Sequence, residues 1–304
     1  MQIDLTLTEP QDDFVFSEEQ YPLFCGGFGA GKSEALFKRL LILKLKYRKL
    51  NVGYFAPSFD LINLIAFPRL TELLTQCGLK FNLNKSEKVF HIDGYGQIIC
   101  RSMDAPNSIV GFEIGDAVLD ELDTMPKDKA ENAWNKVIAR CRQKKPDGMP
   151  NTAAVGTTPE GFRFCYDRWE KRATDKYKLY RAPTYSNPYL PESYIDGLRD
   201  SYPPQLLAAY LDGKFVNLAS GGVYPDFNRD LNRSYETIKP REVLHIGMDF
   251  NVLKMAAVVN VLRDGQAHAV DELVNVRDTP TMCTLIKERF PDHTINIYPD
   301  AAGQ

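Results

Sequence analysis

The sequence lacks paired cysteines, long apolar runs and an excess of positive charge. Its six cysteines are scattered without a C-x-x-C pair and its four histidines do not cluster with them, which argues against a zinc site and favours reduced thiols. No apolar run approaches the length that spans a membrane, and the first residues do not have the shape of a signal peptide. The formal net charge is −3, so any contact with nucleic acid must come from local patches.

The most informative feature that is present is a glycine-rich segment of eight residues. They are Gly26, Gly27, Phe28, Gly29, Ala30, Gly31, Lys32 and Ser33. The segment fits the pattern G-x-x-x-x-G-K-[ST], in which glycines let backbone N–H groups surround a phosphate. The lysine can reach the β- and γ-phosphates of a nucleotide, and the final hydroxyl can bind Mg²⁺. Residues 21–25 predict a strand and residues 33–47 a helix, so we expect phosphate to bind at a helix N-terminus. The alternative is a glycine-rich turn that binds no nucleotide.

Two acids follow another predicted strand, Ala117–Leu119. A phosphate-loop NTPase needs one acid at such a strand end to hold Mg²⁺ and, in many cases, an adjacent base to orient the attacking water. We assign the metal role to Asp120 and the catalytic role to Glu121, and we give no role to Asp123 on the following turn. The alternative is that both acids are solvated residues at a strand end.

Other polar residues near predicted strands are candidates for the same site. Thr157 and Thr158 end the strand 152–156 and could sense the γ-phosphate, coupling hydrolysis to movement; the alternative is a pair of turn residues ahead of a proline. Gln11 lies before the loop and could read the adenine edge through its amide, although a surface glutamine fits the same spacing. Phosphoryl transfer also favours a cation on the developing charge. The candidates, among which the sequence does not choose, are Arg101, Arg140, Arg142 and Arg163.

Short apolar runs alternate with helical stretches through the first two thirds of the chain. Strand 52–56 is followed by a helix at 60–77, and a further helix is predicted at 130–142. Residues 88–93 and 97–102 flank a Gly-Tyr-Gly turn and predict a hairpin. The alternation predicts an α/β fold with a mainly parallel sheet, helices on both faces, and a ligand at the carboxyl ends of the strands.

The pattern changes near residue 215. We expect a first domain over 1–215, a linker over 216–242 and a second domain over 243–304 with the order β-β-β-α-β. In that order the first and last strands can lie side by side, which would bring Asp249 and Asp300 together. Two such carboxylates can share Mg²⁺ or Mn²⁺ ions, which clamp the oxygens of a phosphodiester displacement.

The acids of this second part also have a simpler interpretation. Asp249 and Asp300 could be ordinary acids at strand ends, and Asp271 and Glu272 are possible additional ligands at the end of the third strand. A domain of roughly sixty residues is marginal for an independent core, so we expect it to be incomplete at its C-terminus.

The ordered set of motifs resembles the large terminase subunit of tailed bacteriophages. The matching positions are Gln11, Gly26–Ser33, Leu119–Glu121, Val155–Gly161, Tyr185–Pro188, Gly247–Phe250 and Pro299–Asp300. The resemblance implies a RecA-like P-loop (ASCE) ATPase domain followed by the N-terminal part of an RNase H-like nuclease domain. It implies a motor that uses ATP and Mg²⁺ to move double-stranded DNA into a procapsid, and an endonuclease that cuts concatemeric DNA with Mg²⁺ or Mn²⁺. It further implies a ring of subunits on the portal protein, a small terminase subunit as partner, no membrane contact, and the cytoplasm of an infected bacterial host.

The chain departs from this family in three places. Many members carry an arginine within the phosphate loop, where this chain has Phe28, and many carry one ahead of the acidic strand, where this chain has Val110. The arginine finger is therefore unassigned. The family's nuclease domain continues past Asp300 and supplies further acids, so we expect weak or no nuclease activity from this chain alone.

Two basic runs are candidates for contacts with the DNA backbone, which need cations but no base readout. They are Arg140–Lys145 and, on the helix after the loop, Lys38, Arg39, Lys44, Lys46, Arg48 and Lys49. The alternative for both runs is a solvated helix face.

Two other functions are compatible with the motifs. A cellular helicase or repair ATPase would have a second RecA-like domain, whereas the residues after 243 suggest a nuclease-type sheet. A non-hydrolysing ATP-binding assembly module would explain the missing arginines. Replacing Glu121 by glutamine separates these functions, because only an enzyme that turns over ATP depends on that carboxylate.

Overall fold

The computed structural model describes residues 6–218, 232–251 and 253–300. The chain divides into two compact units, residues 1–220 and 221–304. The division falls within the predicted linker, of which residues 219–231 lie outside the described residues.

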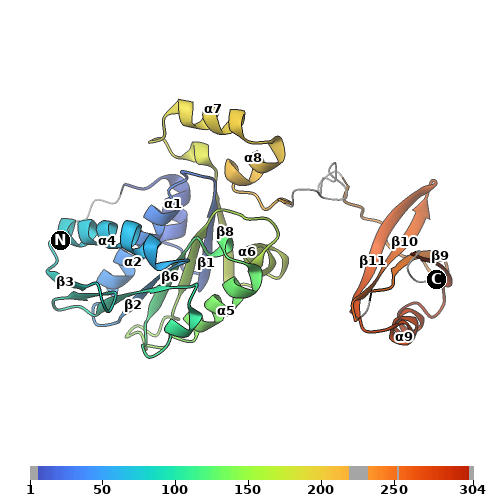
Figure 1. Cartoon of the computed structure of the whole chain (residues 1–304), viewed down its shortest axis with the longest axis horizontal. Coiled ribbons are helices and arrows are strands. Elements are labelled where there is room, and N and C mark those ends of the chain that lie inside the picture. Colours follow the sequence, from blue (N-terminus) through green and yellow to red (C-terminus); the bar gives the residue numbers. More distant parts are fainter. Residues whose placement is uncertain (1–5, 219–231, 252, 301–304) are drawn as a thin grey trace. The chain divides into compact units, whose positions relative to one another are not determined.

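The first unit is built on an eight-stranded sheet with helices on both faces (Figure 1). Its strands are β1 (Tyr21–Gly26), β2 (Val52–Ala56), β3 (Phe81–Asn84), β4 (Val89–Ile92), β5 (Gln97–Ser102), β6 (Asp116–Asp120), β7 (Ala153–Thr157) and β8 (Tyr177–Ala182). They lie in the order β3-β4-β5-β2-β6-β7-β1-β8, and all neighbours from β5 to β8 are parallel. The predicted parallel sheet is confirmed, and the predicted hairpin is the antiparallel pair β4 and β5.

The two edge strands, β3 and β8, have no counterpart among the strands predicted from the sequence. No residue of β3 is buried, and in β8 only the first and last residues are buried. An edge strand has one neighbour and meets solvent, so its side chains need not form the apolar run that reveals a central strand.

The helices of the first unit are α1 (Glu9–Val15), α2 (Lys32–Lys46), α3 (Phe59–Leu61), α4 (Phe67–Gln76), α5 (Lys127–Ile138), α6 (Phe164–Tyr166), α7 (Glu192–Ser201) and α8 (Pro204–Tyr210). π-Helical turns lie at Ile62–Ala66 and Asp167–Lys171, and 3-10 turns lie at Pro106–Ser108, Leu122–Thr124 and Thr184–Ser186. Helix α2 agrees with the prediction to within a residue at each end.

Two helix predictions need correction. The helix predicted at 60–77 is divided by the π-helical turn between α3 and α4, where Pro68 has no N–H to donate to the preceding turn. The helix predicted at 130–142 starts earlier, at Lys127, and ends at Ile138. Its expected last residues leave the helix because Cys141 forms a parallel bridge with Ile114.

Two apolar clusters fill the two sides of the sheet. One contains Leu36 of α2 and side chains of α1 and α4, and the other contains Trp134 of α5 and side chains of α6. Successive residues of β1 divide between them, Phe24 in the first and Cys25 in the second, because neighbouring side chains of a strand point to opposite faces. Packing on both faces fixes the strand ends, which carry the candidate site.

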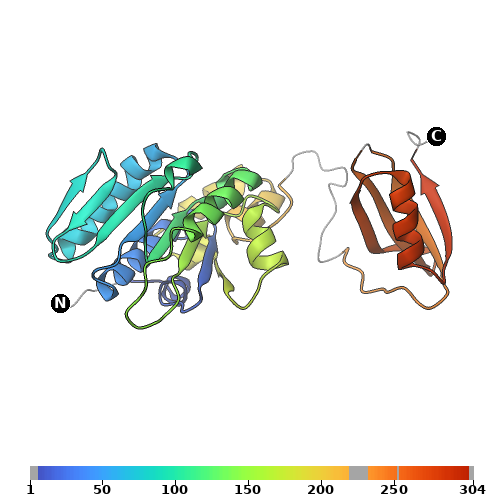
Figure 2. The same ribbon diagram turned by 90° about the horizontal axis from the view of Figure 1, so that it is seen from below.

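The second unit has a four-stranded sheet with one helix on one face (Figure 2). Its elements are β9 (Val243–Asp249), β10 (Met255–Arg263), β11 (Gln266–Val276), α9 (Thr279–Arg289) and β12 (Thr294–Pro299), with strand order β11-β10-β9-β12. Strand β12 lies beside β9, as expected from the sequence for the first and last strands of a β-β-β-α-β unit, and the two strands run parallel. Within the described ranges of both units, no helix is long and apolar enough to cross a membrane.

Candidate functional site

The glycine-rich loop connects β1 to α2 at the carboxyl edge of the parallel strands. β1 ends at Gly26, and α2 begins at Lys32 after Gly31, which has a left-handed backbone with φ of 80°. A Cβ atom on Gly27 would lie 2.5 Å from the carbonyl oxygen of Tyr210 and 2.7 Å from that of Leu211. Glycine is needed at both positions, and the loop leads directly into the N-terminus of a helix, which is where a phosphate cradle lies in nucleotide-binding loops.

A pocket of about 420 Å³ opens beside this loop, which is within the size range of sites for small ligands. Its lining includes Phe28, Lys32, Ser33, Glu121 and Tyr194. Residues that the sequence assigned from two separate motifs, the loop and the acidic strand end, therefore share one pocket.

Lys32 is buried and lies between the loop and the acidic strand end. Its Nζ donates a hydrogen bond to the carbonyl oxygen of Gly27 at 3.0 Å and lies 3.7 Å from Oε1 of Glu121. A buried ammonium group needs such partners, because burial of an unpaired charge is costly. In this arrangement the lysine neutralises a carboxylate rather than a phosphate.

Asp120 ends β6 and is 4% exposed. The hydroxyl of Tyr54 donates to Oδ2 at 2.9 Å, whereas the buried Oδ1 has no hydrogen-bond partner among the described residues. Burial, followed by the charge of Glu121, raises the pKa of this carboxyl to about 6, against the lowering effect of the Ser33 and Tyr54 hydroxyls. An unpartnered carboxylate oxygen near a serine hydroxyl suits Mg²⁺, which takes few protein oxygens and keeps water and phosphate oxygens as its other ligands.

No metal centre made only of side chains is expected beside it. Within residues 6–218, 232–251 and 253–300, there is no group of three or more His, Cys, Asp or Glu that could hold a metal ion. Ser33 and Asp120 fit a Mg²⁺ ion that arrives with a nucleotide, since the phosphates then supply the remaining oxygens.

Glu121 follows Asp120 with a left-handed backbone, φ 49°, which residues other than glycine rarely adopt. Its Oε2 accepts a hydrogen bond from the backbone N–H of Thr158 at 3.1 Å and one from Oγ1 of Thr157 at 3.4 Å. The register of the parallel strands explains this contact, because Asp120 lies opposite Gly156 and the two strands end together. The two threonines predicted to couple hydrolysis to movement therefore contact the predicted catalytic carboxylate directly.

Asp123, which received no role from the sequence, has a structural one. It is fully buried, and its carboxylate accepts hydrogen bonds from the backbone N–H groups of Cys165 at 3.0 Å and Glu160 at 3.3 Å. Its own N–H donates to Oγ1 of Thr157 at 3.1 Å. The residue therefore joins the turn after β6 to the chain after β7.

Gln11 contacts the loop itself. Its Oε1 accepts from the N–H of Thr8 at 3.0 Å, and its Nε2 donates to the carbonyl oxygen of Gly31 at 2.9 Å. The side chain is 6% exposed, so both ends of the amide are used within the protein. The structure thus gives Gln11 a bracing contact with the loop, and contact with adenine stays a prediction.

A helical segment after β8 packs on the loop. Thr184 Oγ1 donates to the carbonyl oxygen of Phe28 at 2.9 Å, and Asn187 Nδ2 donates to that of Gly29 at 2.6 Å. The Phe28 ring stacks on Tyr210 with centroids 4.5 Å apart. Helices α7 and α8 were not among the predicted elements; the only signal in the sequence was the match at Tyr185–Pro188, to which no role was given.

The basic residues of α2 do not form one solvated face. Lys38, Arg39 and Lys44 are buried, and each donates hydrogen bonds to backbone carbonyl oxygens, those of Arg39 lying near the end of α1. Both interpretations from the sequence, a solvated face and a DNA-contacting face, are wrong for these three. Long aliphatic stems let such side chains enter the core while their heads satisfy carbonyl groups. The exposed cations of the run lie at 46–49.

The structure brings Asp249 and Asp300 together at the ends of β9 and β12. Met248 pairs with Pro299, and the N–H of Asp300 donates to the carbonyl oxygen of Met248 at 3.0 Å. Neighbouring parallel strands lie about 4.8 Å apart, so the next residues along each strand are close neighbours. Asp249 Oδ2 accepts from Asn251 Nδ2 at 2.8 Å, and the buried Oδ1 of Asp300 has no partner within the described part of the chain.

The other two acids of this unit are placed elsewhere. Asp271 pairs with Arg289 of α9 at 2.9 Å and lies opposite Val259, whose side chain belongs to the core beneath that helix. Glu272 lies opposite Val258, so β10 separates it from β9. Neither acid is assembled with Asp249 in this structure.

The family comparison agrees with this geometry. A family model described as the N-terminal part of the T4likevirus-type terminase large subunit matches residues 23–230. The chain belongs to the terminase large subunit family. The matched range contains the loop, Asp120 with Glu121, and both threonines. No significant match was found among curated proteins.

Solved structures of phage terminases share the fold of this terminase. The large terminase of a thermophilic bacteriophage covers 98% of this chain and 79% of its own, with a TM-score of 0.60 and 17% identity. The large terminase of bacteriophage HK97 covers 98% of this chain and 70% of its own, with a TM-score of 0.55 and 13% identity. The ATPase domain from Thermus phage P74-26 covers 69% and 94%, with a TM-score of 0.55 and 16% identity. These likenesses establish the RecA-like ATPase fold.

Three of the candidate arginines have different partners, and one of these three contacts the turn that follows β6. Arg163 is the candidate that hydrogen-bonds the turn after β6, with Nη1 3.3 Å from the carbonyl oxygen of Asp123. Arg142 pairs with Glu113 at 2.9 Å, and Arg101 donates to the carbonyl oxygen of Glu87 at 2.9 Å. Of these candidates, the structure favours Arg163 for the cation that phosphoryl transfer requires, a choice that the sequence did not make.

Proposed function

We propose that this terminase is an ATP-hydrolysing motor that moves double-stranded DNA into a procapsid. The observation that carries the proposal is the meeting of Lys32, Glu121 and Thr158 at the ends of β1, β6 and β7. Phosphoryl transfer requires a cation that binds the phosphates and a carboxylate that orients the attacking water. A motor also needs a contact, here that of Thr158 with Glu121, through which the state of the nucleotide can reach the rest of the domain.

Hydrolysis is assigned to the following residues of the chain. The loop N–H groups and Lys32 bind the phosphates of ATP, which draws the Lys32 ammonium away from the carbonyl oxygen of Gly27. Ser33 and Asp120 hold Mg²⁺, which when bound neutralises charge on the β- and γ-phosphates. Glu121 accepts a proton from the attacking water, a role that typically contributes a factor of about 10²–10⁴ in rate.

Coupling to movement is assigned to the contact between β6 and β7. Glu121 is held by Thr157 and Thr158, so a change in its position as water and phosphate arrive also alters the end of β7. The segment that begins at Glu160 is tied to the same turn through Asp123. We propose that this connected set passes the state of the nucleotide to the rest of the domain.

Support for nucleotide and partners comes from the relatives. The large terminase of the thermophilic bacteriophage has been solved with ADP and with ATP-gamma-S. By family membership we propose duplex DNA, the portal protein of a procapsid and a small terminase subunit as partners. We also propose a ring of subunits on the portal and action in the cytoplasm of an infected bacterial host.

A packaging assay tests the motor. Procapsids bearing portals, linear duplex DNA and this terminase are incubated with ATP or with ATP-gamma-S, and DNA protected from added nuclease is measured. Protection is expected with ATP only, and Lys32→Ala is expected to abolish it. Equal protection with both nucleotides would contradict a hydrolysis-driven motor.

Two other functions find less support. A helicase or repair ATPase predicts a second RecA-like domain, whereas the described residues of the second unit form a mixed four-stranded sheet. A non-hydrolysing module predicts no need for a base beside the loop, yet Glu121 lies in the pocket with a left-handed backbone. Such strain is commonly kept where function requires it.

For the second unit we propose a metal-dependent endonuclease site at Asp249 and Asp300. The described residues supply two neighbouring carboxylates and no third, so we expect divalent ions to bind weakly and cutting to be slow. A supercoiled plasmid is incubated with Mg²⁺ or Mn²⁺ and nicked product is measured for the wild type and Asp249→Ala. Efficient metal-dependent nicking that this substitution abolishes would contradict slow cutting and would support the site.

A further inference from the structure

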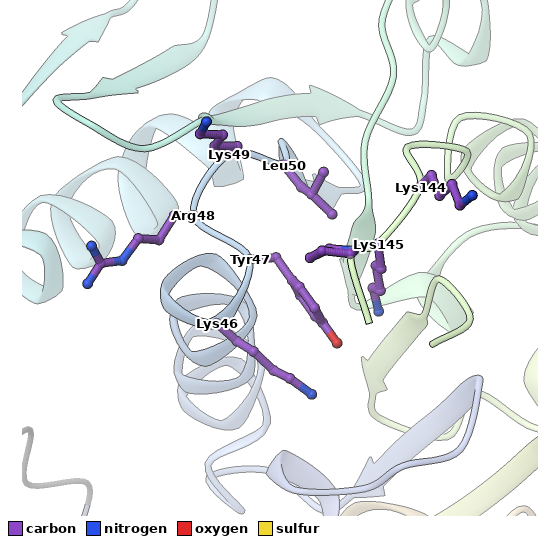
Figure 3. A pocket seen from close by; sticks show the side chains of 8 residues that line it. Lys46, Tyr47, Arg48, Lys49, Leu50, Lys144 and Lys145 are labelled. Carbon is purple, nitrogen blue, oxygen red and sulfur yellow. The ribbon is translucent and has the colours of Figure 1, made fainter. Parts of the chain in front are cut away.

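A second pocket lies at the opposite end of α2 from the ATP site (Figure 3). Its volume is about 540 Å³, and it is formed by the C-terminal end of α2 with the following turn, Lys46–Leu50, and by the segment Lys144–Pro146. Five of its eight lining residues are cations, although the whole chain has a net charge of −3. The two segments come from the two basic runs of the sequence, which the fold brings together.

Part of this positive charge is used to build the pocket. Lys145 is 4% exposed, pairs with the buried Asp116 at 2.8 Å and lies over the Tyr47 ring, 4.7 Å from its centroid. The Tyr47 hydroxyl donates to Asp147 at 2.7 Å, and Lys46 lies 3.6 Å from the same carboxylate. These contacts fix the floor of the pocket and neutralise two of the five cations.

The remaining three cations have no acidic partner. Arg48, Lys49 and Lys144 are exposed, and none of them forms an ion pair within the described ranges. Arg48 lies over the ring of Tyr95, 5.2 Å from its centroid, which leaves its guanidinium edges open to an anion. The rim of the pocket therefore carries a local excess of three positive charges.

The directions of these side chains indicate which kind of anion fits the pocket, a polymer or a small ion. In Figure 3, Arg48 and Lys144 extend away from Tyr47 on opposite sides of the pocket, and Lys49 points in a third direction. One phosphate ion cannot contact three heads that diverge. Duplex DNA carries one negative charge per 1.7 Å or so of helix axis, so several of its phosphates can pair with cations that are spread over a surface.

We propose that this pocket and its rim bind backbone phosphates of duplex DNA. The proposal rests on the proposed function and locates a DNA-contacting surface on the ATPase unit. The contacts are with phosphates and carry no base specificity, as a motor that moves any sequence requires.

The position of the pocket connects it to ATP hydrolysis. Helix α2 begins at Lys32 in the ATP site and ends at Lys46 in the floor of this pocket, a span of about 21 Å at 1.5 Å per residue. Strand β6 begins at Asp116, which holds Lys145, and ends at Asp120 in the Mg²⁺ site, a span of about 13 Å. Two rigid elements thus join the two sites.

The test compares two triple variants that lose the same charge. The pocket variant is Arg48→Gln, Lys49→Gln and Lys144→Gln. The control is Lys80→Gln, Lys85→Gln and Lys129→Gln, which are exposed lysines just before β3, in the β3–β4 turn and in α5. Binding of a labelled linear duplex is measured by fluorescence anisotropy over a series of salt concentrations. Each lost phosphate contact reduces the slope of log affinity against log salt by about 0.9, so the pocket variant should lose between two and three units. The control should lose less than one, and Arg48→Lys alone should keep the wild-type slope.

Further measurements distinguish a wrong assignment of this DNA site from a wrong assignment of the proposed function. A pocket variant with the slope and affinity of the control would overturn the proposal. So would a pocket variant that loses binding of inorganic phosphate but keeps its DNA affinity, since the site would then hold a small ion. Wild-type ATP hydrolysis with linear duplex DNA and procapsids is measured in parallel, because its absence would count against the proposed function, whereas its presence with unchanged slopes would count against this site alone.

Discussion

The backbone N–H of Thr158 donates a hydrogen bond to the carboxylate of Glu121 at 3.1 Å, so the end of β7 holds the candidate base at the end of β6. The other oxygen of that carboxylate lies 3.7 Å from Nζ of Lys32. Under the proposed function, a nucleotide that attracts Lys32 would weaken the second contact and leave the first. We therefore propose that this carboxylate responds to the nucleotide and transmits its state through β7.

Thr157→Val tests this connection. The substitution keeps the shape but removes the hydroxyl that donates to Glu121 and accepts from the buried N–H of Asp123. We expect kcat for ATP to fall about tenfold and the free energy of unfolding to fall by about 1–3 kcal/mol, since a buried donor loses its acceptor. Thr157→Ser should restore most of both quantities. A valine variant with wild-type kcat would show that the hydroxyl has no part in turnover.

Gly27→Ala tests the close approach of the loop to the segment after β8. The new methyl group would meet the carbonyl oxygens of Tyr210 and Leu211 at 2.5 and 2.7 Å, so the backbone must move. We expect the free energy of unfolding to fall by about 1–3 kcal/mol, with weaker ATP binding in calorimetry. Gly197→Ala in α7 is the matched control, because nothing lies within 4 Å of its new methyl group. Equal effects of the two substitutions would contradict close packing of Gly27 against Tyr210 and Leu211.

Gln11→Glu separates the bracing contact from adenine recognition. The glutamate can still accept from the N–H of Thr8, but it cannot donate to the carbonyl oxygen of Gly31. We expect the free energy of unfolding to fall by about 1–3 kcal/mol and the affinities for ATP and GTP to fall by the same factor. A loss of affinity for ATP alone, measured as a change in the ratio of the two dissociation constants, would instead show that Gln11 recognises adenine.

Lys44 gives a prediction for the pH dependence of stability. Burial lowers the pKa of this ammonium group from 10.5 to about 8. Between these values the unfolded chain holds the proton and the folded chain does not, so the free energy of unfolding rises with pH from about 8 to 10.5. Lys44→Met should remove this part of the slope in denaturant titrations, with Lys49→Met as the control for loss of one lysine. Identical slopes for the wild type and Lys44→Met would contradict the shift.

The residues of the candidate site could be named from the sequence because they belong to motifs at the ends of apolar strands, and the structure brings Lys32, Ser33 and Glu121 into one pocket. Lys32 and Ser33 follow from the loop pattern, and Asp120 with Glu121 follow from an apolar run that ends in acids. The strand register then determines which ends meet, and the sequence does not show that register. The contact of Glu121 with Thr158 is therefore a finding of the structure, although both residues were candidates.

The features that the sequence predicted wrongly or missed depend on contacts between distant segments or on edge positions in the sheet. Lys38, Arg39 and Lys44 look like surface residues because charge predicts exposure, yet their heads satisfy carbonyl groups that belong to other segments of the chain. Strand β8 is hidden because an edge strand lacks an apolar run. The contacts of Asn187 with the loop depend on residues far apart in the sequence. None of these features has a local pattern that a reading of the sequence could detect.

The central claim is that Glu121 is the base of a DNA-packaging ATPase. Steady-state hydrolysis of Mg²⁺-ATP is measured for the wild type and Glu121→Gln, alone and with linear duplex DNA and procapsids, together with ATP affinity. We expect turnover that rises with DNA and procapsids in the wild type, and a variant that binds ATP but turns over at least about 10²-fold more slowly. A variant that hydrolyses ATP at the wild-type rate, or a wild type that binds ATP and never turns over on procapsids, would contradict it.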